Sequence, residues 1–249
     1  MSHRVAGALL LAAALVVQGS RTASAAGPTD SQIKADVHRE LARLDRSAER
    51  LTLDVKNGVV MISGDVGTLW LKQEAIRRAL KVKGVQSLEA DVTIPRAEND
   101  AALIKAVGDR IRTYSLYGVY DSIEGRVKNG AVRLDGAVTE PKKSDDLAER
   151  VAKVKGVQSL DNRLVVLPTS KSDDQLRVII ANGIYSDQAF EDYSMVDPPV
   201  HVIVNNGHVT LVGFVRSQIE FIKAESIARS VHGVLALENK VVVTGPGRR

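Results

Sequence analysis

The chain of 249 residues carries 34 lysines and arginines against 30 aspartates and glutamates, and it contains no cysteine. The absence of cysteine excludes disulfide bonds, thiolate nucleophiles and zinc–thiolate sites. The formal charge of +4 is spread along the chain and includes Arg4 and Arg21, so it does not form the basic cluster typical of nucleic-acid binding.

Residues 1–26 have the three parts of a secretory signal peptide. A positive start precedes the apolar run Val5–Val17, and Ala23-Ser24-Ala25 supplies a cleavage site of small residues. The apolar run is shorter than the roughly 20 residues that a membrane-spanning helix needs. We therefore predict cleavage near Ala25/Ala26 and a mature exported protein of charge +2. Retention of the segment as a membrane anchor is the alternative.

Three later segments repeat one pattern, in which an Asn-Gly pair is followed six residues after its glycine by a second glycine. The three segments are 56–64, 128–136 and 205–213. In each copy another glycine lies 20 residues further on, at Gly84, Gly156 and Gly233. Self-similarity at a nearly fixed period indicates repeated structural units. Proline-led polar breaks separate the copies, so we expect a signal peptide at 1–26 and domains at 29–95, 99–168 and 172–244.

Each copy is predicted to begin with a helix, because apolar residues recur on one helical face. In the first copy this face comprises Ile33, Val37, Leu41 and Leu44. An aspartate lies near the start of each helix and is our candidate for its cap: Asp30 (or Ser31 beside it), Asp100 and Asp173.

A β-hairpin is predicted next, because Asn-Gly favours a two-residue turn whose residues have positive φ. With Asn57-Gly58 at the tip, Val55 pairs with Val60 and Leu53 pairs with Ile62. The equivalent pairs are Val127–Val132 and Gly125–Leu134 in the second copy, and Val204–Val209 and Val202–Leu211 in the third. All of these residues share one face, so the opposite face of the sheet is expected to be polar and wet.

A second helix is predicted from apolar positions nine, five and two residues before the later glycine. These positions are Ala75, Ala79 and Val82, then Leu147, Val151 and Val154, then Ala224, Ala228 and Val231. Ser217 and Glu220 predict a capping box for the third copy of this helix. Last strands are expected at Ala90–Ile94, Arg163–Val166 and Lys240–Val243. The fold class is therefore α+β: three tandem two-layer αββαβ sandwiches, each with two helices on one face of a three-stranded sheet.

An N-G-x-V-x-L-x-G hairpin, an alanine-rich helix, V-x-G-V and a final strand together resemble the BON domain family. The matching positions are Gly58, Val60, Ile62, Gly64, Val82, Gly84 and Val85; Gly130, Val132, Leu134, Gly136, Val154, Gly156, Val157 and Asn162; and Gly207, Val209, Leu211, Gly213, Val231, Gly233, Val234 and Asn239. Ala90 stands in the first copy where the family often has asparagine. The resemblance implies a non-enzymatic exported module, similar to osmotically inducible periplasmic proteins, with a proposed affinity for phospholipid. It supplies no catalytic or cofactor-binding residue.

Catalytic and metal chemistry find little support in the residues themselves. His201, His208 and His232 gather in the third copy, but Asn205 is predicted to pair with His208. His201 then lies four positions away, about 13 Å at ~3.3 Å per residue, which is too far for a shared metal. We expect these histidines to be exposed. Since the motif glycines lie in turns and no serine has a nucleophile-elbow context, we expect no catalytic residue, cofactor, metal or small-molecule substrate.

Aromatic residues are few, so their placement is informative. The candidate contact residues for a lipid or partner are Tyr114, Leu116, Tyr117 and Tyr120, which follow the first helix of the second copy beside the basic residues Lys105, Arg110 and Arg112. Amphipathic rings beside basic residues suit a lipid headgroup interface. The alternative is that these rings, and those of Tyr185, Phe190 and Tyr193, close small hydrophobic cores.

The expected function is that of a non-enzymatic periplasmic binding protein of the envelope and osmotic stress response, engaging phospholipid surfaces. The alternative is a protein–protein scaffold or chaperone-like adaptor of the cell envelope, which would accept partner strands at its sheet edges.

Overall fold

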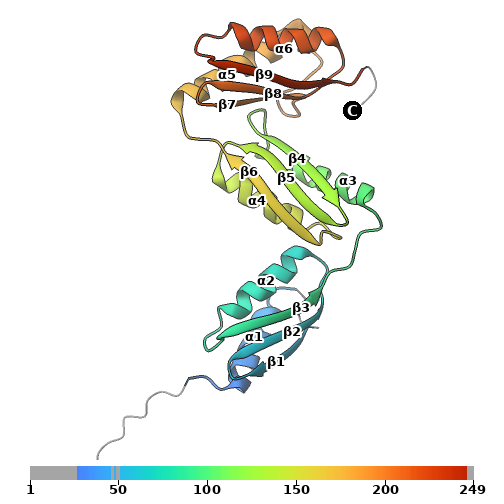
Figure 1. Ribbon diagram of the computed structural model, residues 1–249, viewed down its shortest axis with the longest axis vertical. Helices are drawn as coiled ribbons and strands as arrows, with labels where there is room; N and C mark the ends of the chain where they lie inside the picture. Colours follow the sequence, from blue (N-terminus) through green and yellow to red (C-terminus); the bar gives the residue numbers. More distant parts are fainter. Residues whose placement is uncertain (1–26, 46–47, 49–50, 246–249) are drawn as a thin grey trace, which may run out of the picture.

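The computed structural model describes residues 27–45, 48 and 51–245. The predicted signal peptide, residues 1–26, lies outside the described residues. The described chain forms three αββαβ domains that follow one another along the long axis of the molecule (Figure 1). The predicted fold class, with three tandem sandwiches, is confirmed.

The helices and strands of the three domains correspond one to one. The first domain comprises α1 (Asp30–Ala42), β1 (Thr52–Lys56), β2 (Val59–Asp65), α2 (Leu69–Leu80) and β3 (Ser87–Thr93). The second comprises α3 (Asp100–Arg112), β4 (Ser122–Lys128), β5 (Ala131–Val138), α4 (Pro141–Ala152) and β6 (Ser159–Val166). The third comprises α5 (Lys171–Ser186), the short 3-10 helix η2 (Gln188–Phe190), β7 (Val200–Asn205), β8 (His208–Val215), α6 (Gln218–Ser230) and β9 (Ala236–Val243).

Each sheet places its strands in chain order, β1-β2-β3, β4-β5-β6 and β7-β8-β9. The first two strands of each sheet are antiparallel, as a tight hairpin requires, and the third is parallel to the second. A parallel neighbour needs a crossover connection, which the second helix of each domain provides. Both helices lie on the same side of their sheet (Figure 1).

The predicted hairpin register is confirmed in all three domains. Val55 pairs with Val60, Leu53 pairs with Ile62, and the equivalent pairs form in β4–β5 and β7–β8. The asparagine at each tip has a φ of 51° or 52°, and the glycine after it also has a positive φ. The Asn-Gly turn therefore sets the register of each hairpin. A register shifted by one residue would turn the buried side chains toward the solvent.

The aspartate at the start of each domain's first helix does not cap that helix, contrary to the sequence-based expectation. Thr29, Asn99 and Ser170 are the residues whose side chains cap the helix starts. Asp30 instead accepts hydrogen bonds from the backbone amides of Asn57 and Gly58, at 2.8 and 2.9 Å. Each aspartate therefore ties a helix to a hairpin turn that is distant in sequence, an arrangement we call the aspartate clasp.

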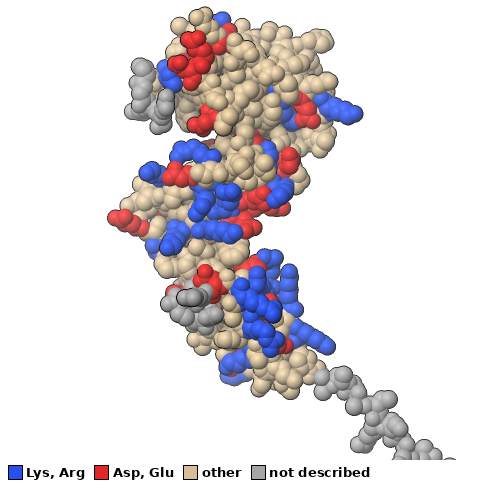
Figure 2. Space-filling view, turned by 180° about the vertical axis from the view of Figure 1, so that it is seen from behind, with Lys and Arg blue, Asp and Glu red and all other residues tan. Residues whose placement is uncertain are grey.

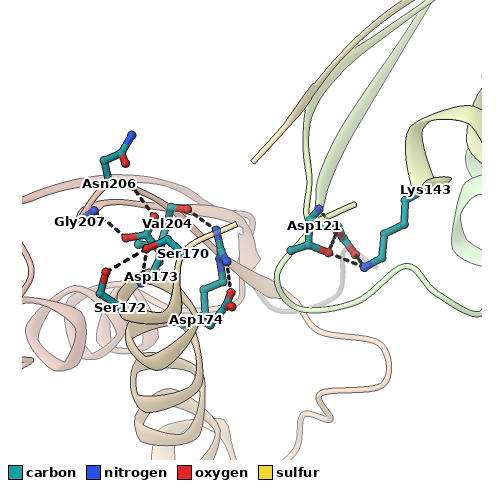
Figure 3. Close-up of polar contacts among 11 residues, drawn as sticks. Asp121, Lys143, Ser170, Ser172, Asp173, Asp174, Val204, Asn206 and Gly207 are labelled. Atoms are coloured by element: carbon teal, nitrogen blue, oxygen red, sulfur yellow. Dashed lines mark hydrogen bonds and ion pairs between the residues drawn. The ribbon is translucent and has the colours of Figure 1, made fainter. Parts of the chain in front are cut away.

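The aspartate clasp recurs in the other two domains. Asp100 accepts from the amides of the turn at 129–130, at 2.6 and 3.0 Å. Asp173 accepts from the amides of Asn206 and Gly207, at 2.7 and 2.9 Å, beneath the turn (Figure 3). Because a carboxylate can accept several hydrogen bonds, one side chain satisfies both amides of a tight turn.

The last strands begin three or four residues earlier than predicted, at Ser87, Ser159 and Ala236. Parallel pairing with the preceding strand starts at the first residue after each hairpin turn and extends the ladder in that direction. The outer sheet face departs from the expected polarity in the third domain, where Phe214 is 62% exposed and its register partner Val242 is 50% exposed.

Candidate functional site at the junction of the second and third domains

The residues proposed as contacts lie in a connecting stretch between α3 and β4, residues 113–121, which we call the tyrosine segment. Its conformation is fixed by Asp121, whose carboxylate is almost fully buried. Asp121 accepts hydrogen bonds from the amides of Gly118 and Thr139, both at 3.0 Å, and from the ammonium group of Lys143 at 2.8 Å. Asp121 and Lys143 face each other across the base of the segment (Figure 3).

Tyr114 points inward and closes the core of the second domain. Its hydroxyl donates to Asp146 at 2.8 Å, and the guanidinium group of Arg150 lies 4.9 Å from the ring centroid. Burial, followed by the bond to Asp146, raises the pKa of Tyr114 to about 12. Most of this ring is therefore unavailable to a lipid or protein partner in this conformation.

The middle of the tyrosine segment contacts the third domain. Val119 is buried in the hydrophobic core of that domain, and its carbonyl accepts from the amide of Val202 on β7 at 2.8 Å. Tyr120 packs against the same core, and burial raises the pKa of its phenol. Since β7 is an edge strand, the second domain covers part of an edge that would otherwise be open.

His201 is buried at this junction, contrary to the expectation that the histidines are exposed. Its ring lies 5.2 Å from the ring of Tyr117, with an interplanar angle of 34°. Only 9% of the residue is accessible, because the tyrosine segment covers β7. His208 and His232 are exposed, as predicted.

Leu116 is the most exposed of the four candidate contact residues, at 48%. Tyr120 packs against the core of the third domain, and Tyr114 is buried in the second. Tyr117 packs against the core of the second domain, and its ring contacts His201 of the third. The structure thus brings the three rings into packing positions and leaves the leucine free on the surface. A lipid or partner contact at this segment stays a prediction, with Leu116 as its most accessible member.

A basic groove of about 340 Å³ lies between α3 and α4, beside Tyr114. It is lined by Arg110, Asp146, Glu149, Arg150 and Lys153. Asp146 is bound by Lys142 and by the hydroxyl of Tyr114, and Lys153 pairs with Glu149. Arg110 makes no ion pair among the described residues, so its charge is free to attract an anion.

A second groove, also of about 340 Å³, separates α2 of the first domain from α4 and β6 of the second. At this groove the ammonium group of Lys153 lies 4.5 Å from the ring centroid of Trp70, a cation–π distance. The side-chain amide of Gln158 donates to the carbonyls of Ile94 and Pro95 at 3.2 and 3.3 Å. The first two domains are therefore joined by few direct polar contacts.

The aromatic residues of the third domain's extra segment form a lid over its core. Phe190 is fully buried, between Tyr185 at 6.2 Å and Tyr193 at 5.9 Å, measured between ring centroids. The hydroxyl of Tyr185 donates to the carbonyl of Val200 at 2.6 Å. For these three rings the structure agrees with the core-closing alternative and not with a surface role.

Several residues that build the junction were not singled out from the sequence. Asp121, Lys143 and Val119 carry no local pattern that distinguishes them from other loop and helix residues. The three clasp aspartates did carry a signal, because each lies at the start of a first helix, but the signal was interpreted as capping.

Within the described ranges, no three histidine, aspartate or glutamate side chains converge as a metal site would require. Nor does the described part of the chain contain a helix that is long and apolar enough to cross a membrane.

The BON domain family matches the chain at residues 29–96, 99–168 and 172–245. These three matches span most of the sequence and coincide with the three αββαβ domains. The chain therefore belongs to the BON domain family, as its hairpin pattern predicted.

No curated protein matches this chain. Solved structures similar to it include CdsD, a structural protein of the type III secretion system of Chlamydia trachomatis, at 16% identity over 85% of this chain and 91% of that one, with a TM-score of 0.25. The periplasmic domain of the inner-membrane protein PrgH from S. typhimurium is 14% identical over 80% of this chain and 97% of that one, with a TM-score of 0.21. TM-scores of this size support no conclusion about function.

Proposed function

We propose that this BON-domain protein is a non-enzymatic binding protein of the periplasm that contacts anionic phospholipid surfaces and acts in the envelope and osmotic stress response. In this proposal the predicted signal peptide directs export and is cleaved near Ala25/Ala26. The observation that supports lipid contact is the basic groove of the second domain, close in sequence to the exposed Leu116 of the tyrosine segment.

The charges of the groove favour an anionic ligand. Arg110 and Arg150 make no ion pair among the described residues, whereas Lys153 is paired with Glu149 and Asp146 with Lys142, so two unpaired cations remain in the groove. Because the mature chain carries a net charge of only +2, attraction to an anionic surface has to be local. A basic residue near such a surface contributes ~1 kcal/mol to binding.

Leu116 provides the apolar part of the contact. Full burial of an exposed leucine side chain contributes about 1.5–3 kcal/mol, and Leu116, which is 48% exposed, can gain part of this on insertion. A basic groove and an exposed leucine that is close to it in the sequence together supply the two parts of a peripheral membrane contact, electrostatic attraction and shallow insertion.

A binding function is also favoured by the state of the groove's acidic side chains. Asp146 and Glu149 are both held in ion pairs, and the pKa of Asp146 is lowered chiefly by its bond to Lys142. A general acid or base near neutral pH would need its pKa moved toward neutrality instead.

The experiment is co-sedimentation of the mature protein with phosphatidylcholine vesicles, with and without phosphatidylglycerol, at low and high salt. We expect binding only with the anionic lipid, weakened by salt. Arg110→Gln should weaken binding about fivefold, the effect of ~1 kcal/mol. The matched control Arg126→Gln removes the same charge from the outer face of the sheet and should change binding much less.

Equal effects of the two substitutions would place the contact elsewhere than the groove. Sedimentation that is independent of both lipid charge and salt would contradict the electrostatic mechanism.

A protein–protein scaffold or chaperone-like adaptor is the second candidate, and the third domain favours it. Phe214 and Val242 are adjacent across β8 and β9 on the outer face of the sheet, and both are exposed. A partner protein that covers this pair would be lost on Phe214→Ser substitution, while vesicle binding through the second domain would be retained. Pull-down from an envelope extract with the parent protein and with the Phe214→Ser variant distinguishes the two functions.

A further inference from the structure

The contact between the second and third domains is built around one histidine. His201 lies on β7, and the tyrosine segment of the second domain covers its ring. Next to it, the amide of Val202 donates to the carbonyl of Val119, so the histidine sits where the two domains are joined by their backbones. Val119 completes the contact by inserting its side chain into the core of the third domain.

A neutral ring can make both hydrogen bonds of His201. Nδ1 lies 3.1 Å from the carbonyl oxygen of Gly118, which can only accept, so Nδ1 carries a hydrogen. Nε2 lies 3.3 Å from the hydroxyl of Tyr117 and can accept its proton. A neutral imidazole satisfies both contacts at once, with one nitrogen as donor and the other as acceptor.

Burial of the ring disfavours a positive charge more than the two nearby carboxylates favour it. The charged groups that face it are Asp121 from the second domain and Asp197 from the segment preceding β7. Asp121 already forms an ion pair with Lys143 and accepts hydrogen bonds from two backbone amides, and Asp197 is exposed to solvent. If Nε2 carried a proton, the Tyr117 oxygen would have to accept that hydrogen bond and its own O–H would have to point away from the ring.

We propose that His201 is a pH-sensitive latch, which holds the third domain against the second while its imidazole is neutral and releases it when the imidazole is protonated. The latch does not depend on lipid binding. At acidic pH the third domain is then free to move relative to the second.

The direction of the pH dependence follows from linkage. Burial lowers the pKa of His201 below its ordinary value of 6.5 in the docked arrangement. The undocked state therefore binds more protons as the pH falls below about 6.5, and docking weakens from that point down to the lower pKa of the docked state. Above about pH 6.5 docking is at full strength.

The test is hydrogen exchange of the Val202 amide in the mature protein, corrected for the intrinsic rate, at about pH 8 and about pH 5. We expect its protection to fall about tenfold or more at the acidic pH, while amides in the centre of β8 keep theirs. His201→Gln should remove this pH dependence, because glutamine can donate to Gly118 and accept from Tyr117 without titrating.

His208→Gln is the matched control, because His208 is exposed on the same hairpin and should leave the pH dependence intact. A second readout uses Lys128→Cys and Ala236→Cys, exposed positions of the two domains, in a chain that has no other cysteine. Spin labels there should give a distance distribution that broadens at about pH 5 in the parent and not in His201→Gln. Unchanged Val202 protection and an unchanged distribution in the parent at acidic pH would overturn the latch.

Discussion

The aspartate clasp shows how a single carboxylate can hold a helix and a hairpin together. Asp30, Asp100 and Asp173 each accept from the two amides of an Asn-Gly turn that lies 27 to 34 residues further along the chain. Hydrogen bonds to an ionised acceptor are roughly twice as strong as those between neutral groups. The clasp thus fixes the first helix against the turn that sets the register of the sheet.

Replacing the clasp residue should destabilise its domain. Asp173→Ala removes both acceptors and leaves the buried amide of Gly207 without a partner, at a cost of about 1–3 kcal/mol. Glu191→Ala is the control, because Glu191 is an exposed acidic residue of the same domain with no side-chain partner among the described residues. Urea unfolding of the two variants measures the difference, and equal midpoints would show that the clasp contributes no stability.

The aspartate clasp leaves no signal in the sequence that separates it from helix capping. An aspartate near a helix start favours the helix through its charge and through capping, and sequence alone offers no reason to look further. The partner amides lie far along the chain and carry no side-chain signature. Only the folded domain brings Asp173 beneath Asn206 and Gly207 (Figure 3).

At the scale of elements, the hairpin was the most predictable part of the chain. The Asn-Gly pair fixes the turn, the turn fixes the register, and the register fixes which residues are buried. The first residue of each last strand was predicted too late, because parallel pairing with β2, β5 or β8 has no local turn to mark where it begins. The start of each last strand is therefore set by pairing between residues that are distant in the sequence.

The second glycine of each hairpin pattern tests this account of the elements. Gly136 has a φ of 130°, and a Cβ atom there would overlap the carbonyl oxygen of Ser122. Gly136→Ala should therefore cost ~3 kcal/mol or more, from strain and overlap together.

Gly108→Ala, in the middle of α3, serves as the opposite case in the same domain. A Cβ atom there meets nothing within 4 Å, and alanine in a helix is favoured over glycine by about 0.5–1 kcal/mol. The midpoint temperature of thermal unfolding should be lower than that of the parent for Gly136→Ala and higher for Gly108→Ala. A stable Gly136→Ala protein would show that the observed backbone at this position is not required.

At the scale of the whole molecule, apolar packing crosses both junctions. The buried apolar side chains of the first and second domains form one continuous cluster, and Val119 of the second domain is buried in the core cluster of the third. At the second junction a backbone hydrogen bond between Val119 and Val202 adds to this packing. The basic residues are most evident over the lower two domains, and the third presents large uncharged areas (Figure 2). Sequence predicted the number of domains from their repetition, but docking depends on segments in which the copies differ.

Trp70 is the only tryptophan of the chain and reports on the first junction. Lys153→Ala removes the cation over its ring, a contact of about 0.5–1 kcal/mol, and should shift its fluorescence emission to the red as water gains access. Lys155→Ala, an exposed neighbour without a side-chain partner in the described chain, should leave the emission unchanged. An identical spectrum for both variants would mean that the junction does not persist in solution.

We propose that the second domain presents the contact surface for anionic lipid, with Leu116 at the membrane. The most direct measurement places an environment-sensitive dye on Leu116→Cys, which is a unique site because the chain has no cysteine. We predict a blue shift of the dye emission on vesicles that contain phosphatidylglycerol, reversed by high salt. A protein that sediments with these vesicles while the dye at position 116 stays in water would contradict the claim.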